Sequence, residues 1–349
     1  MGGVTGDPAG ATSAVAESSL SRARQFLTRI GMQASDDDGL WTPLTGGVSS
    51  DLWRVELPGR TVCVKGALAQ LRVADDWQAP VSRNAVEYAW LQFAARQRPA
   101  NVPQVYARDD AAGFFVMEYL DARSHPTWKA QLLAGVVDQA FAGAVGDLVG
   151  ALQAASARDA DVPRRFATYA NFAVLRLDPY LRTTAARSPL VADRLNALAD
   201  RTAAVHLALV HGDVSPKNIL VGPAGPVLLD AECAWFGDPA FDVAFCLTHI
   251  ALKMVLRPAG SGDLLAAGSA LVAAHASHVE WEDVGTHAGR AAALLPALLL
   301  ARVDGSSPVE YLDDEQRELV RRTATRMLQT PQAEPTEVLQ RWRQLTAAG

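Results

Sequence analysis

The feature that most constrains this chain is the stretch LVHGDVSPKNILVGPAGPVLLDAE, which runs from Leu209 to Glu232. Two apolar runs, NILV and PVLLD, flank a Gly-Pro-Ala-Gly-Pro turn, and this pattern predicts a short β-hairpin. Asp213 lies in the polar loop before the hairpin, Asn218 stands where the first strand begins, and Asp230 closes the second. Because a hairpin returns the chain to its starting point, we expect these three oxygen-bearing side chains at one edge.

Such a group of side chains meets the requirements of phosphoryl transfer, in which positioning and charge neutralisation do most of the work. A carboxylate at Asp213 would orient an acceptor hydroxyl and take its proton. Asn218 and Asp230 would supply oxygen ligands, which Mg²⁺ prefers. The reaction also needs a lysine that pairs with the nucleotide phosphates.

Composition excludes several other classes of protein. The chain has 349 residues, of which 49% are hydrophobic, and a net charge of -6, so it lacks the basic character of a nucleic-acid binder. Its three scattered cysteines predict buried thiols in a reducing compartment. The longest apolar run near the C-terminus, 291–303, is too short to span a bilayer, and no signal peptide is visible. We therefore expect a cytoplasmic protein without nucleic-acid or membrane partners.

The order of the expected elements predicts an α+β fold with two lobes. Residues 1–18 are small and polar, which indicates a disordered leader. Strand and turn patterns around one amphipathic helix, Ser82–Gln97, give the order β-β-β-α-β-β. The remainder is helical, with breaks expected at prolines such as Pro179. The expected lobes are an N-terminal nucleotide-binding lobe over 19–120 and a catalytic and acceptor-binding lobe over 121–349.

The motif His211-Gly212-Asp213-x4-Asn218, followed by Asp230 and by GDPAFDVA at 237–244, resembles a known superfamily. It is similar to the catalytic loop and metal-binding segment of small-molecule kinases of the aminoglycoside phosphotransferase and choline kinase type. The resemblance implies a bilobal protein-kinase-like fold, with a small β-rich N-terminal lobe and a larger, mainly helical C-terminal lobe. Protein kinases would be expected to show His-Arg-Asp, Asp-Phe-Gly and Ala-Pro-Glu, which this chain lacks, so a small-molecule acceptor is favoured.

The resemblance also implies roles in the N-terminal lobe. Lys65, on the third expected strand, matches the lysine that pairs with the nucleotide phosphates, and Glu87 on the next helix matches its ion-pair partner. The Gly-Gly turn that ends in Ser49 and Ser50 stands where a phosphate-covering loop is expected. The backbone of the interlobe connection would bind the purine of ATP or GTP. That connection contains Met117, Glu118 and Tyr119.

Three more residues belong to the catalytic loop or its support. Lys217 lies inside the loop and would either reach a phosphate or point to solvent. His211 is expected to brace the loop rather than to take part in the reaction. Asp242 is also expected to be structural, bonding to the backbone of the loop.

Four residues are candidates for binding the acceptor, and most have a structural alternative. Glu232 follows Asp230 by two residues, so strand alternation turns it to the same face, where it would assist at a metal or bind substrate. Trp235 would form an aromatic wall or pack in the core. His249 and Lys253 stand one helical turn apart and would border the acceptor cleft or form a partly solvated helix edge.

The function expected from these observations is Mg²⁺-dependent transfer of a nucleotide γ-phosphate to a hydroxyl of a small, sugar-containing molecule. An antibiotic is included among the acceptors, with a role in resistance or self-resistance. The alternatives are a metabolic kinase for methylthioribose, choline or homoserine, and a non-catalytic nucleotide-binding scaffold. Residues 240–300 are not notably acidic, which favours a neutral or acidic acceptor over an aminoglycoside. The choice between ATP and GTP and the oligomeric state are left open by the sequence.

Overall fold

The computed structural model describes residues 8–34, 39–44, 50–68 and 82–348. The chain divides into two compact units, Met1–Tyr88 with Gln104–Tyr119, and Ala89–Pro103 with Leu120–Gly349. The sequence did not indicate that 89–103 would join the second unit. It does so because the C-terminal half of helix α2 (Arg83–Gln97) packs there, with the Trp90 ring 4.8 Å from the ring of His211.

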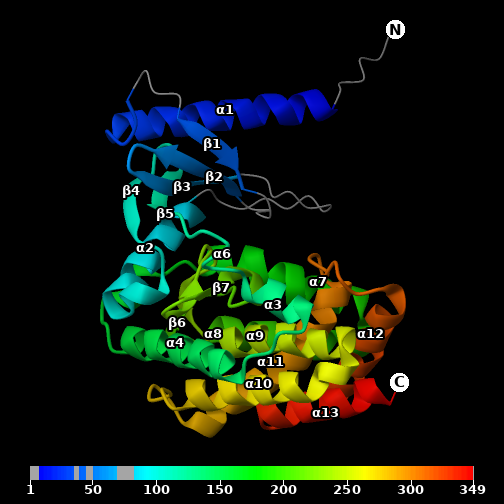
Figure 1. The fold of residues 1–349 in the computed structure, drawn as a ribbon. Coiled ribbons are helices and arrows are strands. Elements are labelled where there is room, and N and C mark those ends of the chain that lie inside the picture. The colour runs from blue at the N-terminus through cyan, green and yellow to red at the C-terminus, as the bar shows by residue number, and fades with distance from the viewer. Residues whose placement is uncertain (1–7, 35–38, 45–49, 69–81, 349) are drawn as a thin grey trace. The chain divides into compact units, whose positions relative to one another are not determined.

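The first unit is built on a five-stranded antiparallel sheet in the order β1-β2-β3-β5-β4 (Figure 1). The strands are β1 (Leu40–Pro43), β2 (Ser50–Leu57), β3 (Arg60–Ala67), β4 (Val105–Asp109) and β5 (Phe114–Glu118). With α2 between β3 and β4, the expected order of three strands, a helix and two strands is confirmed.

Helix α1 (Pro8–Arg29) packs on this sheet and completes the core of the first unit. Phe26 and Leu27 are fully buried in one apolar cluster with Val55 and Val64. The helix begins at Pro8, so it takes in much of the segment that the sequence indicated as a disordered leader. The alanines of that segment favour helix, which explains the difference.

The second unit is mainly helical (Figure 1). Its α-helices beyond the end of α2 are α3 (Trp128–Ala134), α4 (Gln139–Ala157), α5 (Val162–Arg165), α6 (Tyr169–Phe172), α7 (Thr183–Arg187), α8 (Ala192–Ala204), α9 (Ala240–Leu256), α10 (Ser261–Ala276), α11 (Val284–Asp304), α12 (Asp314–Gln329) and α13 (Pro335–Ala347). Its shorter or wider helices are η1 (Pro99–Asn101), η2 (Ala173–Arg182), η3 (Pro189–Val191), η4 (Pro216–Asn218) and η5 (Pro258–Gly260). Its strands are β6 (Ala208–Val210), β7 (Ile219–Gly222), β8 (Gly225–Leu228) and β9 (Trp235–Gly237).

Helix α9 lies at the centre of this unit, where it packs against α10 and α11, while α4 covers α10 and α12 covers α11. Among the described residues, α4 and α11 are long and apolar enough to cross a membrane. In this fold most of each apolar segment is buried, 61% in α4 and 67% in α11, which is typical of the core helices of a globular unit.

The break expected at Pro179 is absent. The chain stays helical from α6 through η2, a π-helical segment, into α7. A proline removes one backbone donor, and in this wider turn its own carbonyl accepts a hydrogen bond from the backbone N–H of Ser306, 2.9 Å away. The uninterrupted helix matters because it carries Arg176 and Tyr180 to the site described next.

Candidate active site

Two short antiparallel strand pairs of the second unit position the expected catalytic loop. Strand β6 pairs with β9, and β7 pairs with β8 in a register that joins Ile219 to Leu228. One step further out, the backbone N–H of Leu229 donates to the carbonyl of Asn218 at 2.9 Å. Asp230 therefore follows directly beside Asn218, and the hairpin brings the two expected metal ligands together.

Asp230 is the one non-glycine residue with a positive φ in the described part of the chain, at 66°. A side chain in this left-handed region costs of order 1–3 kcal/mol, and such strain gathers at functional sites. The surrounding hairpin holds the conformation, which sets the direction of the carboxylate as the chain leaves β8.

Asp213 is buried, at 3% exposure, and its Oδ2 lies between two cations. Nη2 of Arg176 is 2.8 Å from this oxygen, and Nζ of Lys217 is 3.2 Å from it. Burial opposes the ionisation of Asp213, but the charges of Lys217 and Arg176 outweigh it and hold the pKa well below its usual range. Asp213 is therefore a carboxylate at neutral pH. The side-chain amide of Asn218 donates to the backbone carbonyl of Asp213 at 3.2 Å, which closes the loop.

Arg176 is a part of this site that the sequence did not indicate. It is 6% exposed, and its guanidinium pairs with Asp213 and also donates to the carbonyls of Gly212 and Leu175. Its Cζ lies 5.7 Å from the ring centre of Tyr180. Arg176 lies far from the loop in sequence, and the chain is rich in arginine. Nothing near it in sequence therefore marks it as the partner of Asp213.

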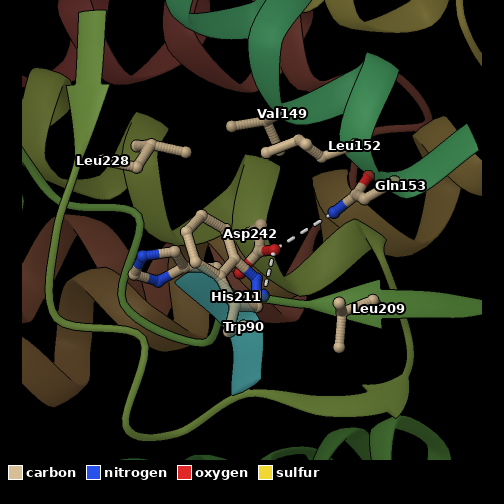
Figure 2. Close-up of a pocket in the computed structure, with 8 residues that line it drawn as sticks. All are labelled: Trp90, Val149, Leu152, Gln153, Leu209, His211, Leu228 and Asp242. Carbon is tan, nitrogen blue, oxygen red and sulfur yellow. Dashed lines mark hydrogen bonds between the residues drawn. The ribbon is translucent and has the colours of Figure 1, made fainter. Parts of the chain in front are cut away.

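Asp242, at the start of α9, fixes the backbone of the loop (Figure 2). Its carboxylate accepts from the backbone N–H groups of His211 and Gly212, both at 2.8 Å, and from Nε2 of Gln153 at 3.1 Å. Burial raises the pKa of Asp242 to about 7, although these donors act in the opposite direction. The expectation that Asp242 bonds to the loop backbone is confirmed.

Gly212 and His211 complete the support of the loop. Gly212 has a φ of 79°, and a Cβ at this position would lie 2.8 Å from Cβ of Cys233, so only glycine fits. The ring of His211 stands edge-on to Trp90, and its Nδ1 accepts from the backbone N–H of Asp213 at 3.2 Å. Burial lowers the pKa of His211 to about 4, so the ring is neutral at pH 7. This geometry agrees with a bracing role.

In the first unit, Lys65 and Glu87 form the ion pair that the resemblance implied. Lys65 projects from β3 and Glu87 from α2, with Nζ 2.7 Å from Oε2. Their side chains are 4% and 2% exposed, so the pair is shielded from solvent. A buried pair of this kind fixes the direction of a lysine that would otherwise sample many rotamers.

The other residues expected to contact the nucleotide are distributed over the same unit. Ser50 begins β2 and is buried, whereas Ser49 lies outside the described residues. Met117 and Glu118 end β5, and Tyr119 is the last residue of this unit. The backbone N–H of Glu118 already donates to the carbonyl of Gln104 at 2.8 Å. This N–H is thus used within the first unit, and contacts of residues 117–119 with a purine stay a prediction.

Two of the acceptor candidates are buried beside the loop. Glu232 is 6% exposed, and its charge helps to raise the pKa of Arg176. Trp235 is 1% exposed and stacks on Phe172 at 4.7 Å, with the His206 ring edge-on at 5.4 Å. The aromatic-wall hypothesis for Trp235 is wrong in this structure, because core packing covers the ring.

The interpretation of His249 and Lys253 as a partly solvated helix edge is also wrong. Both project from α9, and they are 8% and 1% exposed. The sequence could not indicate this, because the helices that cover α9 come from segments far along the chain. Lys217, by contrast, has a side chain that is 48% exposed.

Asn218 and Asp230 fit a divalent cation of the magnesium type. The amide nitrogen of Asn218 is used by the carbonyl of Asp213, which leaves its oxygen as the coordinating atom. Among the described residues no group of three or more His, Cys, Asp or Glu side chains could hold a metal ion. Mg²⁺ is commonly held by one or two carboxylates together with water and substrate phosphates, so two oxygen donors suffice.

Comparisons with known proteins agree with this geometry. A family profile described as the phosphotransferase enzyme family matches residues 40–269. The methylthioribose kinase of Cronobacter sakazakii is 26% identical over 235 residues, covering 58% of this chain and 56% of that protein. That of Escherichia coli O45:K1 is 27% identical over 233 residues, covering 58% and 55%. The chain thus spans just over half the length of these curated relatives.

Two solved structures have the same fold. An amicoumacin kinase in complex with AMP-PNP, Ca²⁺ and Ami has a TM-score of 0.57 at 14% identity, covering 91% of this chain and 97% of that one. A protein from Ralstonia eutropha, named as an aminoglycoside phosphotransferase, has a TM-score of 0.51 at 13% identity, covering 94% and 98%. With the family match over most of the chain, the α+β protein-kinase-like fold and the loop described above, the conclusion is that this chain belongs to the phosphotransferase enzyme family.

Proposed function

We propose that this protein transfers the γ-phosphate of ATP or GTP, with Mg²⁺, to a hydroxyl of a small, sugar-containing molecule. The observation that carries the proposal is the catalytic loop. A buried carboxylate, Asp213, is held ionised beside an amide and a second carboxylate, Asn218 and Asp230, which the hairpin brings to its edge. The family match supports the same reaction class.

Asp213 acts in this mechanism mainly by orienting the acceptor hydroxyl. Its pKa lies well below the usual range, so it is a weak base and attracts a proton only after the hydroxyl oxygen has become acidic. This timing suits a loose transition state, in which bond formation to the nucleophile lags behind bond breaking. Arg176 fixes the carboxylate, and the Asp242 contacts fix the backbone that carries it.

Asn218 and Asp230 would hold the metal ion. When bound, Mg²⁺ neutralises the charge of the nucleotide phosphates. Lys217, with its half-exposed side chain beside Asp213, would reach the same phosphates.

The first unit would supply the nucleotide contacts. Lys65, directed by Glu87, would grip the phosphates. Ser49 and Ser50 would cover them, and the backbone of residues 117–119 would bind the purine.

The acceptor class rests on the relatives. The curated relatives are methylthioribose kinases, which favours a sugar-containing metabolite. The amicoumacin kinase structure gives a reason to test antibiotics as a second candidate class. We further propose a cytoplasmic location, with a purine nucleotide and the acceptor as the binding partners.

A mass-spectrometric screen tests the proposal. Purified protein, Mg²⁺ and ATP or GTP are incubated with methylthioribose, nucleoside antibiotics, macrolides, aminoglycosides, choline and simple sugars. The expected result is a gain of one phosphoryl group on at least one compound, reduced by orders of magnitude in Asp213→Asn. Near-normal turnover of Asp213→Asn would falsify the assigned role. Failure to bind Mg²⁺–nucleotide would favour a scaffold without catalysis.

A further inference from the structure

We propose that a largely buried cationic row on η2, α9, α11 and the loop that follows α11 binds an anionic group, a carboxylate or phosphate, carried by the acceptor. The inference rests on the proposed function and adds a substrate class to it. The row consists of Arg176, Tyr180, Arg302, His249, Lys253 and Tyr311, and it starts at the carboxylate of Asp213.

The first half of the row is a continuous set of contacts from the loop. Arg176 pairs with Asp213, and its Cζ lies 5.7 Å from the ring centre of Tyr180. The hydroxyl of Tyr180 accepts from Nη1 of Arg302 at 3.0 Å, and Cζ of Arg302 lies 5.7 Å from the same ring. Two guanidinium groups therefore flank one phenol ring.

The second half of the row holds a buried lysine. Lys253 is 1% exposed, and its Nζ lies 3.2 Å from the hydroxyl of Tyr311 and 4.3 Å from the ring centre. Within the described part of the chain, no carboxylate forms an ion pair with Lys253 or Arg302, and the nearby Glu310 pairs with Lys129. Burial and the charge of Lys129 lower the pKa of Lys253 to about 7, although the charge of Glu310 acts in the opposite direction.

His249 stands about one helical turn before Lys253 on α9. Burial, followed by the charges of Arg302 and Lys253, holds its pKa well below the usual value, whereas Asp213 acts in the opposite direction. The charges of Asp213, Arg302 and Lys253 thus all act on the imidazole, and the ring is neutral at pH 7. No hydrogen bond reaches this ring from the described residues, so it is free to bond to a ligand.

The charges of the row define what it can bind. A buried cation without an anionic partner is unfavourable, and an incoming anion supplies that partner. Hydrogen bonds between charged groups are the strong ones, so an anion that reaches Arg302 or Lys253 would be held firmly. An ammonium group at the same place would be repelled. The row therefore favours acidic acceptors and disfavours aminoglycosides.

The chain offers a direct assay, because it contains only four lysines. Labelling the lysine ε-carbons with ¹³C gives four NMR signals, and the one absent from Lys253→Met is Lys253. With Mg²⁺–AMP-PNP present throughout, the protein is titrated with glucuronate, glucose 6-phosphate, methyl glucoside or glucosamine. These ligands carry a carboxylate, a phosphate, no charge and an ammonium group.

The expected result is that glucuronate or glucose 6-phosphate shifts the Lys253 signal and raises the pKa of Lys253 by about one unit or more, whereas methyl glucoside and glucosamine do not. Which of the two anions acts identifies the group. The inference is overturned by no response to either anion, by an equal response to glucosamine, or by a full response to Mg²⁺–AMP-PNP alone, which would assign the row to the nucleotide.

Kinetics of variants separate this inference from the proposed function. Lys253→Met and Arg302→Met are expected to raise the KM for an anionic acceptor about tenfold or more, with the KM for the nucleotide unchanged. Arg326→Met, which removes an exposed charge on α12, is the control. Lys253→Met should also keep or raise the Tm. A lower Tm without an anion response would mean a structural lysine. Anion binding at Lys253 in a protein that transfers no phosphate would refute the reaction and leave the subsite standing.

Discussion

Replacing Arg176 by methionine tests how the loop is held. Methionine keeps much of the side-chain volume but removes the cation that lies 2.8 Å from Asp213 and the donor to the carbonyl of Gly212. A neighbouring arginine lowers the pKa of an aspartate by about 1–3 units, and each unit corresponds to about 1.4 kcal/mol. The carbonyl left without its donor adds about 1–3 kcal/mol. Part of this loss of stability is offset, because the variant no longer has to desolvate a buried guanidinium group on folding.

We therefore expect Arg176→Met to lower the free energy of unfolding by about 3 kcal/mol, the lower end for a broken buried pair. For a unit of this size the Tm should fall by about 6–12 °C. Lys217→Met is the matched control. It removes a cation from the same oxygen, but Lys217 has a side chain that is 48% exposed, so water screens its charge and the loss should stay below about 1 kcal/mol.

The assay is chemical denaturation of the wild type, both variants, Asp213→Asn and the double variant with Arg176→Met. The coupling between Arg176 and Asp213 should be about 2 kcal/mol at pH 7. Because the folded pKa of Asp213 lies well below its unfolded value, this stabilisation is fully present above about pH 4 and is lost as the pH falls below it. If Arg176→Met does not fold, Arg176→Lys keeps the charge and should recover part of the stability. A coupling below about 0.5 kcal/mol, or one that persists in acid, refutes the reasoning.

Three further outcomes are expected. Gly212→Ala should lose about 2 kcal/mol or more and most of the turnover, whereas Gly59→Ala, with the same φ of 79° but open space around it, should lose about 1 kcal/mol; denaturation and a kinase assay compare them. The folded pKa of His211, about 4, lies below its unfolded value. The contribution of the neutral ring to the free energy of unfolding should therefore be complete above about pH 6.5 and fall between pH 6.5 and 4. His211→Gln should remove this pH dependence of stability. Glu87→Gln should weaken nucleotide binding about tenfold by leaving Lys65 misdirected, as measured with a fluorescent nucleotide.

The sequence predicted those parts of the site that lie close together along the chain. Asp213, Asn218 and Asp230 belong to one loop and hairpin, so turn residues and strand alternation were enough to group them. Lys65 and Glu87 were expected to pair because the family resemblance, applied to the order of strands and helix, implied it. The same local reasoning found the five strands, although not the pairing of β3 with β5 that joins them in one sheet.

Contacts between distant segments could not be predicted in this way. Arg176 lies on a helix that was expected to break at Pro179, and nothing near it in sequence marks it as a partner of Asp213. Lys253 and His249 carry the helical spacing of an amphipathic edge, but whether that edge is solvated depends on which helices cover α9. Trp235 has the same ambiguity, since an aromatic residue after a metal-binding segment serves equally as core or as binding wall.

Helix α9 carries Asp242, which positions the catalytic loop, and Lys253, which belongs to the proposed anion subsite, on one rigid rod. At about 1.5 Å of rise per residue, the backbone positions of these two residues are about 16 Å apart. An acceptor held by its anion would therefore meet Asp213 at a fixed distance along its own length. On this proposal, the hydroxyl that is phosphorylated is the one that lies at this distance from the anionic group of the acceptor. Regioselectivity among several hydroxyls then follows from the spacing along one helix.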